Sequence, residues 1–220
     1  MAICSAYRAN SAQIVQKILE IYEPNPPLIA DVTHGLGVFW RKESLKQIPF
    51  FDKERLVITS DMKRDADVRA DFRTLPYRDK TFGAIFLDPP WGNLSTAPRK
   101  TGTAERYKLE PISVKDLRAL YTEGMEEAAR ILAPGGFLVI KCQDQVCSGQ
   151  RHWFSQDIFE HGLTLNLKIV DRMTQIISER DIESDSLDDD APQVHFRSID
   201  SHWWIMQKPK RKKVNHVTDK

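Results

Sequence analysis

Cysteine is scarce and long apolar runs are missing in this sequence of 220 residues. Three cysteines are an odd number in a chain long enough to form its own core, so a disulfide framework is neither needed nor indicated. No stretch approaches the roughly 20 consecutive apolar residues that a membrane helix needs. The segment from Met1 to Gln13 lacks the charged and apolar regions of a signal peptide. We therefore expect a cytoplasmic protein with reduced thiols.

Residues that could bind a metal ion are also few. Cys142, Cys147 and His152 stand close in sequence, but Cys142 continues a strand-like run. No fourth ligand stands at a spacing typical of zinc sites. We expect no metal site.

The sequence has no excess of one charge, with 32 Lys and Arg, 31 Asp and Glu and a net charge of +1. This balance neither demands nor excludes a nucleic-acid partner, because the local distribution of charge decides phosphate binding. Lys208 to Lys213 form a basic run, and Asp181 to Asp190 form an acidic one. Both runs are also typical of solvated, mobile chain.

Apolar runs alternate with segments of helical spacing along most of the chain. The helical spacing is clearest at Ser11 to Tyr22 and at Val114 to Leu132. Such alternation predicts an α/β fold with a mostly parallel sheet and helices on both faces. The runs that indicate buried parallel strands are Leu28 to Val32, Leu56 to Thr59, Phe82 to Leu87 and Phe137 to Ile140.

The pattern changes toward the end of the chain. Leu163 to Met173 and His202 to Gln207 indicate two more strands joined by an acidic connection, which predicts a terminal antiparallel strand at one side of the sheet. The connection, 178–201, is longer than most loops, and we expect part of it to be flexible. We expect one domain over 1–207 and a basic tail over 208–220.

A glycine turn, Asp31-Val-Thr-His-Gly35-Leu-Gly37, follows the first predicted strand and precedes a helix-like segment around Phe39 to Lys46. The glycines allow a sharp turn and close approach of a ligand to the backbone, and such a crevice suits a nucleotide-like cofactor. Trp40 replaces the third glycine of a dinucleotide fingerprint, and a P-loop is excluded because no Gly-Lys-Ser/Thr follows. A purely structural turn is the alternative. The candidate cofactor residues here are Asp31, Thr33, Gly35 and Gly37.

Two further acids complete the candidate cofactor site. Asp61 follows the second predicted strand, where α/β nucleotide sites use a carboxylate to accept hydrogen bonds from ribose hydroxyls. Asp71 lies where a third loop could bring it to an adenine ring. A helix cap for Asp61 and a turn for Asp71 are the alternatives.

The most specific motif is Asp88-Pro89-Pro90-Trp91-Gly92, after the third predicted strand. The prolines have no N–H to donate, so the segment presents carbonyls beside the Asp88 carboxylate. Two acceptors suit an amino group, because accepting both protons directs the nitrogen lone pair toward an electrophile. Trp91 offers a flat face on which a base could stack.

The glycine turn followed by Asp88-Pro-Pro-Trp91 resembles the class I S-adenosylmethionine-dependent amino-methyltransferases, which include the adenine and cytosine amino-methyltransferases of DNA. The resemblance spans about Ser11 to Gln207. It implies a Rossmann-like fold, S-adenosylmethionine as cofactor at the glycine turn, and Asp88, Pro89, Pro90 and Trp91 as the catalytic residues that hold the target amine. A duplex base would have to leave the stack to reach Asp88.

Nucleic acid is the expected partner, DNA before RNA. No segment is long enough for the large target-recognition region of a sequence-specific DNA methyltransferase. The segment from Gly92 to Pro111 mixes basic and aromatic residues suited to phosphates and unstacked bases, although a lid over the cofactor is equally consistent. Lys141 to Gln145 follow the fourth strand and could line the substrate pocket, or Gln143 and Asp144 could cap the next helix. The candidate substrate residues are Arg99, Lys100, Arg106, Tyr107 and Lys141.

Three other functions stay open. An RNA base methyltransferase would use the same motif. A protein glutamine methyltransferase would act on a similar amide, but that family's motif resembles Asn-Pro-Pro-Tyr. A non-catalytic nucleic-acid-binding subunit is the third, although Asp31, Gly35, Gly37 and Asp88 are intact.

Overall fold

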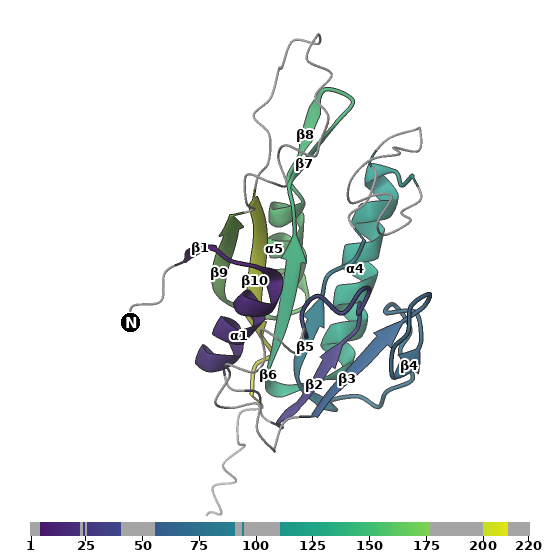
Figure 1. Cartoon of the computed structure of the whole chain (residues 1–220), viewed down its shortest axis with the longest axis vertical. Coiled ribbons are helices and arrows are strands. Elements are labelled where there is room, and N and C mark those ends of the chain that lie inside the picture. The colour runs from purple at the N-terminus through teal and green to yellow at the C-terminus, as the bar shows by residue number, and fades with distance from the viewer. Residues whose placement is uncertain are drawn as a thin grey trace, which may run out of the picture.

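A computed structural model describes residues 5–22, 24, 26–40, 56–90, 94, 111–176 and 200–210. Within these residues an eight-stranded sheet forms the centre of the molecule, as Figure 1 shows. Its strands are β1 (Ala6–Arg8), β2 (Leu28–Asp31), β3 (Leu56–Asp61), β4 (Val68–Arg69), β5 (Phe82–Leu87), β6 (Leu132–Cys142), β9 (Lys168–Ile176) and β10 (Asp200–Gln207). They lie in the order β1-β9-β10-β6-β5-β2-β3-β4.

The sheet is parallel except at one strand. Neighbours from β6 through β5, β2 and β3 to β4 pair in parallel, and so do β1 and β9. Strand β10 is antiparallel to both β6 and β9. The prediction of a mostly parallel sheet with a terminal antiparallel strand is therefore confirmed.

Strand β9 begins later than the sequence predicted. Leu163 and Thr164 belong instead to the end of helix α5 (Phe154–Thr164). The helix ends because Asn166 takes a left-handed φ of 55°, and the N–H of Leu167 donates to the carbonyl of Gly162. Apolar spacing alone could not separate this last helical turn from the strand that follows.

Helices cover both faces of the sheet, as predicted. Helix α1 (Ser11–Ile21) buries Ile14 and Val15 in the same cluster as Trp203. Helices α4 (Val114–Ile131) and α5 pack on the opposite face, in the cluster that contains Trp204. The two tryptophans lie on opposite faces because successive residues of a strand alternate sides.

Local signals in the sequence start the two long helices. The Asn10 side chain accepts from the N–H of Gln13, and the Gln13 side chain accepts from the N–H of Asn10, which makes a capping box for α1. Ser113 caps α4 by accepting from the N–H of Asp116.

Lys208, the first residue of the basic run, is attached to the sheet. Its Nζ donates to the carbonyls of Ala129 and Leu132 at the end of α4, at 2.6 and 2.8 Å. Its N–H donates to the carbonyl of Gly136. Burial lowers the pKa of Lys208. This cation therefore closes the helix end, and the rest of the run from residue 211 lies outside the described residues.

Candidate active site

The carboxyl ends of β2, β3, β5 and β6 meet at one edge of the sheet because these strands are parallel. Asp31 and Asp61 are the last residues of β2 and β3, and Asp88 directly follows β5. Lys141 is the second-last residue of β6. Candidate residues from distant parts of the sequence thus share one edge.

The glycine turn is held by a buried carboxylate. Asp31, with 1% of its surface exposed, accepts from the N–H of Thr33 at 3.1 Å and from the indole N–H of Trp40 at 2.6 Å. Gly35 and Gly37 have φ values of 58° and 66°, in the left-handed region that favours glycine. Trp40 thus holds the turn from the position where a dinucleotide fingerprint has its third glycine.

Asp61 ties the end of β3 to the glycine turn. One carboxylate oxygen accepts from the N–H of Gly35 at 2.9 Å, and the other accepts from the N–H groups of Lys63 and Arg64, both at 2.7 Å. The carboxylate therefore shapes two loops at once. An ionised carboxylate has about four acceptor positions, which leaves room for a further donor.

Asp88 is joined to the glycine turn and to β6. Its N–H donates to the Thr33 hydroxyl at 2.7 Å. Its carboxylate oxygen Oδ2 lies 3.6 Å from Nζ of Lys141, and both side chains are largely buried. Pro89, which follows, is buried, and Pro90 is exposed.

Lys141 contacts more than Asp88. Its Nζ also donates to the Ser11 hydroxyl at 3.3 Å and lies 5.4 Å from the ring centre of Trp203. These contacts place the ammonium between α1 and the Asp-Pro-Pro loop. Lys141 is the one predicted substrate residue among those that the structure describes.

Asp71 lies in a different environment from the other predicted cofactor residues. Its carboxylate accepts from the backbone and guanidinium of Arg73, which also pairs with Glu123 of α4. The hydrogen bonds from Arg73 lower the pKa of Asp71. Among the described contacts no hydrogen bond joins Asp71 to the glycine turn.

Asp144, one of the two residues that could cap the next helix, binds the first turn of that helix. Its carboxylate accepts from the N–H of Ser155 at 2.8 Å and from the Ser155 hydroxyl at 2.9 Å, in the first turn of α5. Gln143 donates to the carbonyl of Asp200. Both side chains thus have structural roles at the end of β6.

Several candidates lie outside the described residues. The segment predicted as helical around Phe39 to Lys46 is described only to residue 40, and the connection 178–201 only from residue 200. Trp91, Arg99, Lys100, Arg106 and Tyr107 also fall outside.

Two sequence expectations concern absences. Over the described ranges, His, Cys, Asp and Glu side chains form no cluster that could hold a metal ion. Within the same residues, no helix is both long and apolar enough to cross a membrane.

His34 belongs to the site, although no motif in the sequence singled it out. Its Nδ1 is buried and lies 3.5 Å from Oδ2 of Asp31. The adjacent Asp31 carboxylate raises the pKa of His34. The separation of three residues from Asp31 inside a tight turn is the signal that could have revealed the pair.

We expect His34 to make stability fall as pH rises. Because its pKa is raised on folding, its contribution is complete below the unfolded pKa and is lost as pH passes the folded pKa. The free energy of urea unfolding should fall more steeply between about pH 6 and pH 8 in the wild type than in His34→Gln. Equal pH slopes for the two proteins would contradict this prediction.

No protein-family model matches this sequence, and no curated protein does. Solved structures do match. The [4+2]-cyclase SpnF is 13% identical over 91% of this chain and 82% of its own, with a TM-score of 0.54. A Bacillus halodurans protein with a provisional methyltransferase assignment is 13% identical over 89% and 99%, with a TM-score of 0.51.

Two further solved structures, both of methyltransferases by name, are similar to this chain. The 1,6-didemethyltoxoflavin-N1-methyltransferase of Burkholderia thailandensis, solved with S-adenosylhomocysteine, is 10% identical over 91% of this chain and 79% of its own, with a TM-score of 0.50. The chain spans about half, 54%, of a provisionally assigned DNA modification methylase from Thermus thermophilus, at 16% identity over 66% of this chain. The TM-score of this match is 0.44.

The similar structures share the fold of this chain. Strand β2, which leads into the glycine turn, lies between β5 and β3, and the antiparallel β10 is inserted between β6 and β9. The chain therefore has the Rossmann-like fold of the class I S-adenosylmethionine-dependent methyltransferases.

Proposed function

We propose that this chain is an S-adenosylmethionine-dependent methyltransferase that acts on the exocyclic amino group of a nucleic-acid base, with adenine or cytosine in DNA favoured. One observation carries the proposal. The hydrogen bond from the N–H of Asp88 to the Thr33 hydroxyl joins the Asp-Pro-Pro loop directly to the glycine turn. The group that would hold the amine thus borders the turn that would hold the methyl donor.

The residues of the glycine turn fit the cofactor. Left-handed Gly35 and Gly37 expose backbone without a Cβ, and the carboxylates of Asp31 and Asp61 stand on either side of the turn. Asp61 is proposed to accept from the ribose hydroxyls, and Asp71 from the adenine amine after leaving Arg73. S-adenosylmethionine, when bound, supplies a methyl group made electrophilic by its sulfonium. The fold supports this assignment.

Asp88 and Pro89 would hold the target amine. The Asp88 carboxylate accepts one proton of the NH₂ group and the Pro89 carbonyl accepts the other, which directs the nitrogen lone pair out of the ring plane. Pro90 stiffens the loop because its φ is fixed. Trp91 would stack on the base. Fixed acceptors lower the barrier because they need no reorganisation during the reaction.

Lys141 would orient the carboxylate of Asp88. With Nζ 3.6 Å from Oδ2, the ammonium would restrict the rotation of the carboxylate that is proposed to accept the substrate proton. The contacts of Lys141 with Ser11 and Trp203 hold the ammonium in place. The proposal therefore gives Lys141, a candidate substrate residue, the role of positioning Asp88.

The proposal is tested by incubating the protein with tritiated S-adenosylmethionine and separate pools of DNA, RNA and protein, followed by nucleoside mass spectrometry. The expected result is N6-methyladenine or N4-methylcytosine in DNA. Label only in RNA or only in protein would establish one of the other methyltransferase functions instead. If calorimetry detects no cofactor binding, the chain is a non-catalytic subunit.

The basic tail is expected to attract phosphates without taking part in the reaction. A truncation that removes residues 211–220 keeps Lys208 at the end of α4 and deletes Arg211, Lys212 and Lys213. DNA binding should weaken, and the slope of log affinity against log salt should become shallower by about two to three. Turnover at saturating DNA should stay close to wild type. An unchanged salt slope would show that the tail is a solvated terminus.

A further inference from the structure

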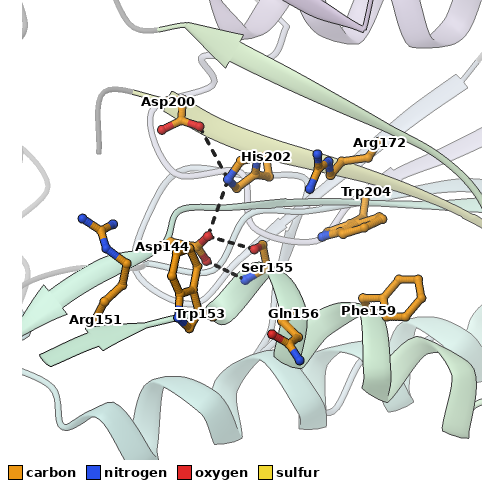
Figure 2. A pocket seen from close by; sticks show the side chains of 10 residues that line it. All are labelled: Asp144, Arg151, Trp153, Ser155, Gln156, Phe159, Arg172, Asp200, His202 and Trp204. Carbon is orange, nitrogen blue, oxygen red and sulfur yellow. Dashed lines mark hydrogen bonds and ion pairs between the residues drawn. The ribbon is translucent and has the colours of Figure 1, made fainter. Parts of the chain in front are cut away.

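A cavity lies on the face of the sheet that α5 covers, away from the Asp88 site. It has a volume of about 560 Å³ and lies between β9 and β10 on one side and the start of α5 on the other. Figure 2 shows its lining side chains, among them Trp204, Arg172 and His202 from the strands and Trp153 and Phe159 around the helix. This volume is typical of sites for small molecules.

Trp204 brings an unused hydrogen-bond donor to this cavity. The residue is 8% exposed, and its indole nitrogen Nε1 is buried without a hydrogen-bond partner among the described residues. Figure 2 shows the nitrogen end of the ring facing Ser155 and the cavity. Leaving a buried donor unpaired costs free energy, so the geometry favours a ligand that accepts from it.

Arginine side chains lie over aromatic rings at two places around the cavity. The Arg172 guanidinium is exposed and lies 5.6 Å from the ring centre of Trp204. Across the described residues, no carboxylate forms an ion pair with it. Arg151 lies 5.5 Å from the ring of Trp153, which is 55% exposed. Arginine beside an open aromatic face is the combination that binds a base and its phosphate.

The two carboxylates of the cavity are already engaged. Asp144 accepts two hydrogen bonds from Ser155 and lies 3.6 Å from Nε2 of His202. Asp200 also lies 3.6 Å from the same nitrogen. Both carboxylates thus lie beside His202, and Figure 2 shows the Arg172 side chain without an ion pair to either of them.

We propose that this cavity binds a nucleotide unit, with the base stacked on the exposed ring of Trp153 and the phosphate held by Arg172 and the indole N–H of Trp204. The site is distinct from the Asp88 site, because Trp204 lies on the α5 face while Trp203, beside Lys141, lies on the α1 face. Its chemistry stands without the proposed function. A free nucleotide and one unit of a nucleic-acid strand are the two possible sources.

The test is calorimetric titration of adenosine 5′-monophosphate into protein saturated with S-adenosylhomocysteine, which blocks the cofactor site. Binding should be seen in the wild type, and Arg172→Gln should weaken it about tenfold, the usual worth of one charge-assisted contact. Trp204→Phe keeps an aromatic ring without the N–H and should also weaken it. Arg78→Gln is the matched control, because this exposed arginine lies in the loop before the amino end of β5 and does not line the cavity.

Equal affinities in Arg172→Gln and Arg78→Gln, or no binding to the wild type, would overturn the proposal. Inorganic phosphate and adenosine are titrated separately, and each should bind more weakly than the nucleotide. If phosphate alone bound as tightly, the cavity would be a simple anion site and the nucleotide assignment would be wrong.

Two further arms separate the sources and the two proposals. Tighter binding of a short single-stranded oligonucleotide, weakened by Arg172→Gln, would identify a strand as the occupant, and competition by the mononucleotide alone would identify a free nucleotide. Both results support a nucleotide site. Nucleotide binding without methyl transfer to any nucleic acid would reject the proposed function and keep this site. Methyl transfer without nucleotide binding would reject this site alone.

Discussion

Replacing Asp88 by alanine should lower the single-turnover rate of methyl transfer by roughly a hundredfold or more, in line with the loss of one preorganised polar group. Cofactor affinity should change little. The reason is that Asp88 contacts the glycine turn through its backbone N–H, which the substitution keeps, while its carboxylate faces Lys141. The substitution therefore keeps the hydrogen bond between Asp88 and Thr33 of the turn.

The measurement pairs cofactor titration with single-turnover methylation on the same Asp88→Ala protein. Asp88→Asn is the matched variant, because it keeps the size of the side chain and one acceptor but removes the charge opposite Lys141. Its rate should lie between those of the alanine variant and the wild type. If cofactor binding collapsed while transfer at saturating cofactor matched wild type, Asp88 would belong to the cofactor site.

Replacing Gly35 by valine should abolish detectable cofactor binding. Gly35 has a φ of 58°, which a β-branched residue rarely adopts, and its N–H donates to Asp61. A side chain here would also occupy the surface where the cofactor is proposed to approach the backbone. Strain and steric exclusion act in the same direction, so the effect should exceed that of a change at Asp61 alone.

The control for Gly35→Val is Gly149→Val. Gly149 also has a positive φ, 72°, but a Cβ there meets no atom within 4 Å. It lies in the turn between β7 (Gln145–Cys147) and β8 (Gln150–His152), so its variant measures backbone strain away from the proposed cofactor turn. Calorimetry and thermal unfolding should be run on both variants. Wild-type cofactor affinity in a folded Gly35→Val protein would refute the assignment.

The order of elements and the site's edge followed from the sequence alone. Buried strands of Val, Ile, Leu and Phe are visible in a sequence as continuous apolar runs. The predicted strand Phe82–Leu87 matches β5 at both ends. Because parallel strands place their carboxyl ends at one edge, the sequence is enough to assign Asp31, Asp61 and Asp88 to the same edge. The position of a motif at the end of a strand can thus be predicted from the sequence, because strand direction determines it.

Boundaries and side-chain partners required the tertiary structure. The end of α5 at Thr164 depends on a left-handed Asn166, which apolar periodicity does not show. Lys208 was predicted as part of a free basic tail, yet it closes α4 because β10 brings it to the helix end. The Lys208 contacts join residues far apart in sequence, so no local pattern encodes them.

The sequence by itself determined the α/β class, the glycine turn and the Asp-Pro-Pro loop, because each depends on local composition and on strand direction. Only the tertiary structure decided that Lys141 faces Asp88 and that Asp144 binds the first turn of α5. It also placed Arg172 over Trp204 beside the cavity on the α5 face. The physical reason is that strand pairing sets which side chains meet, and pairing is a property of the whole sheet.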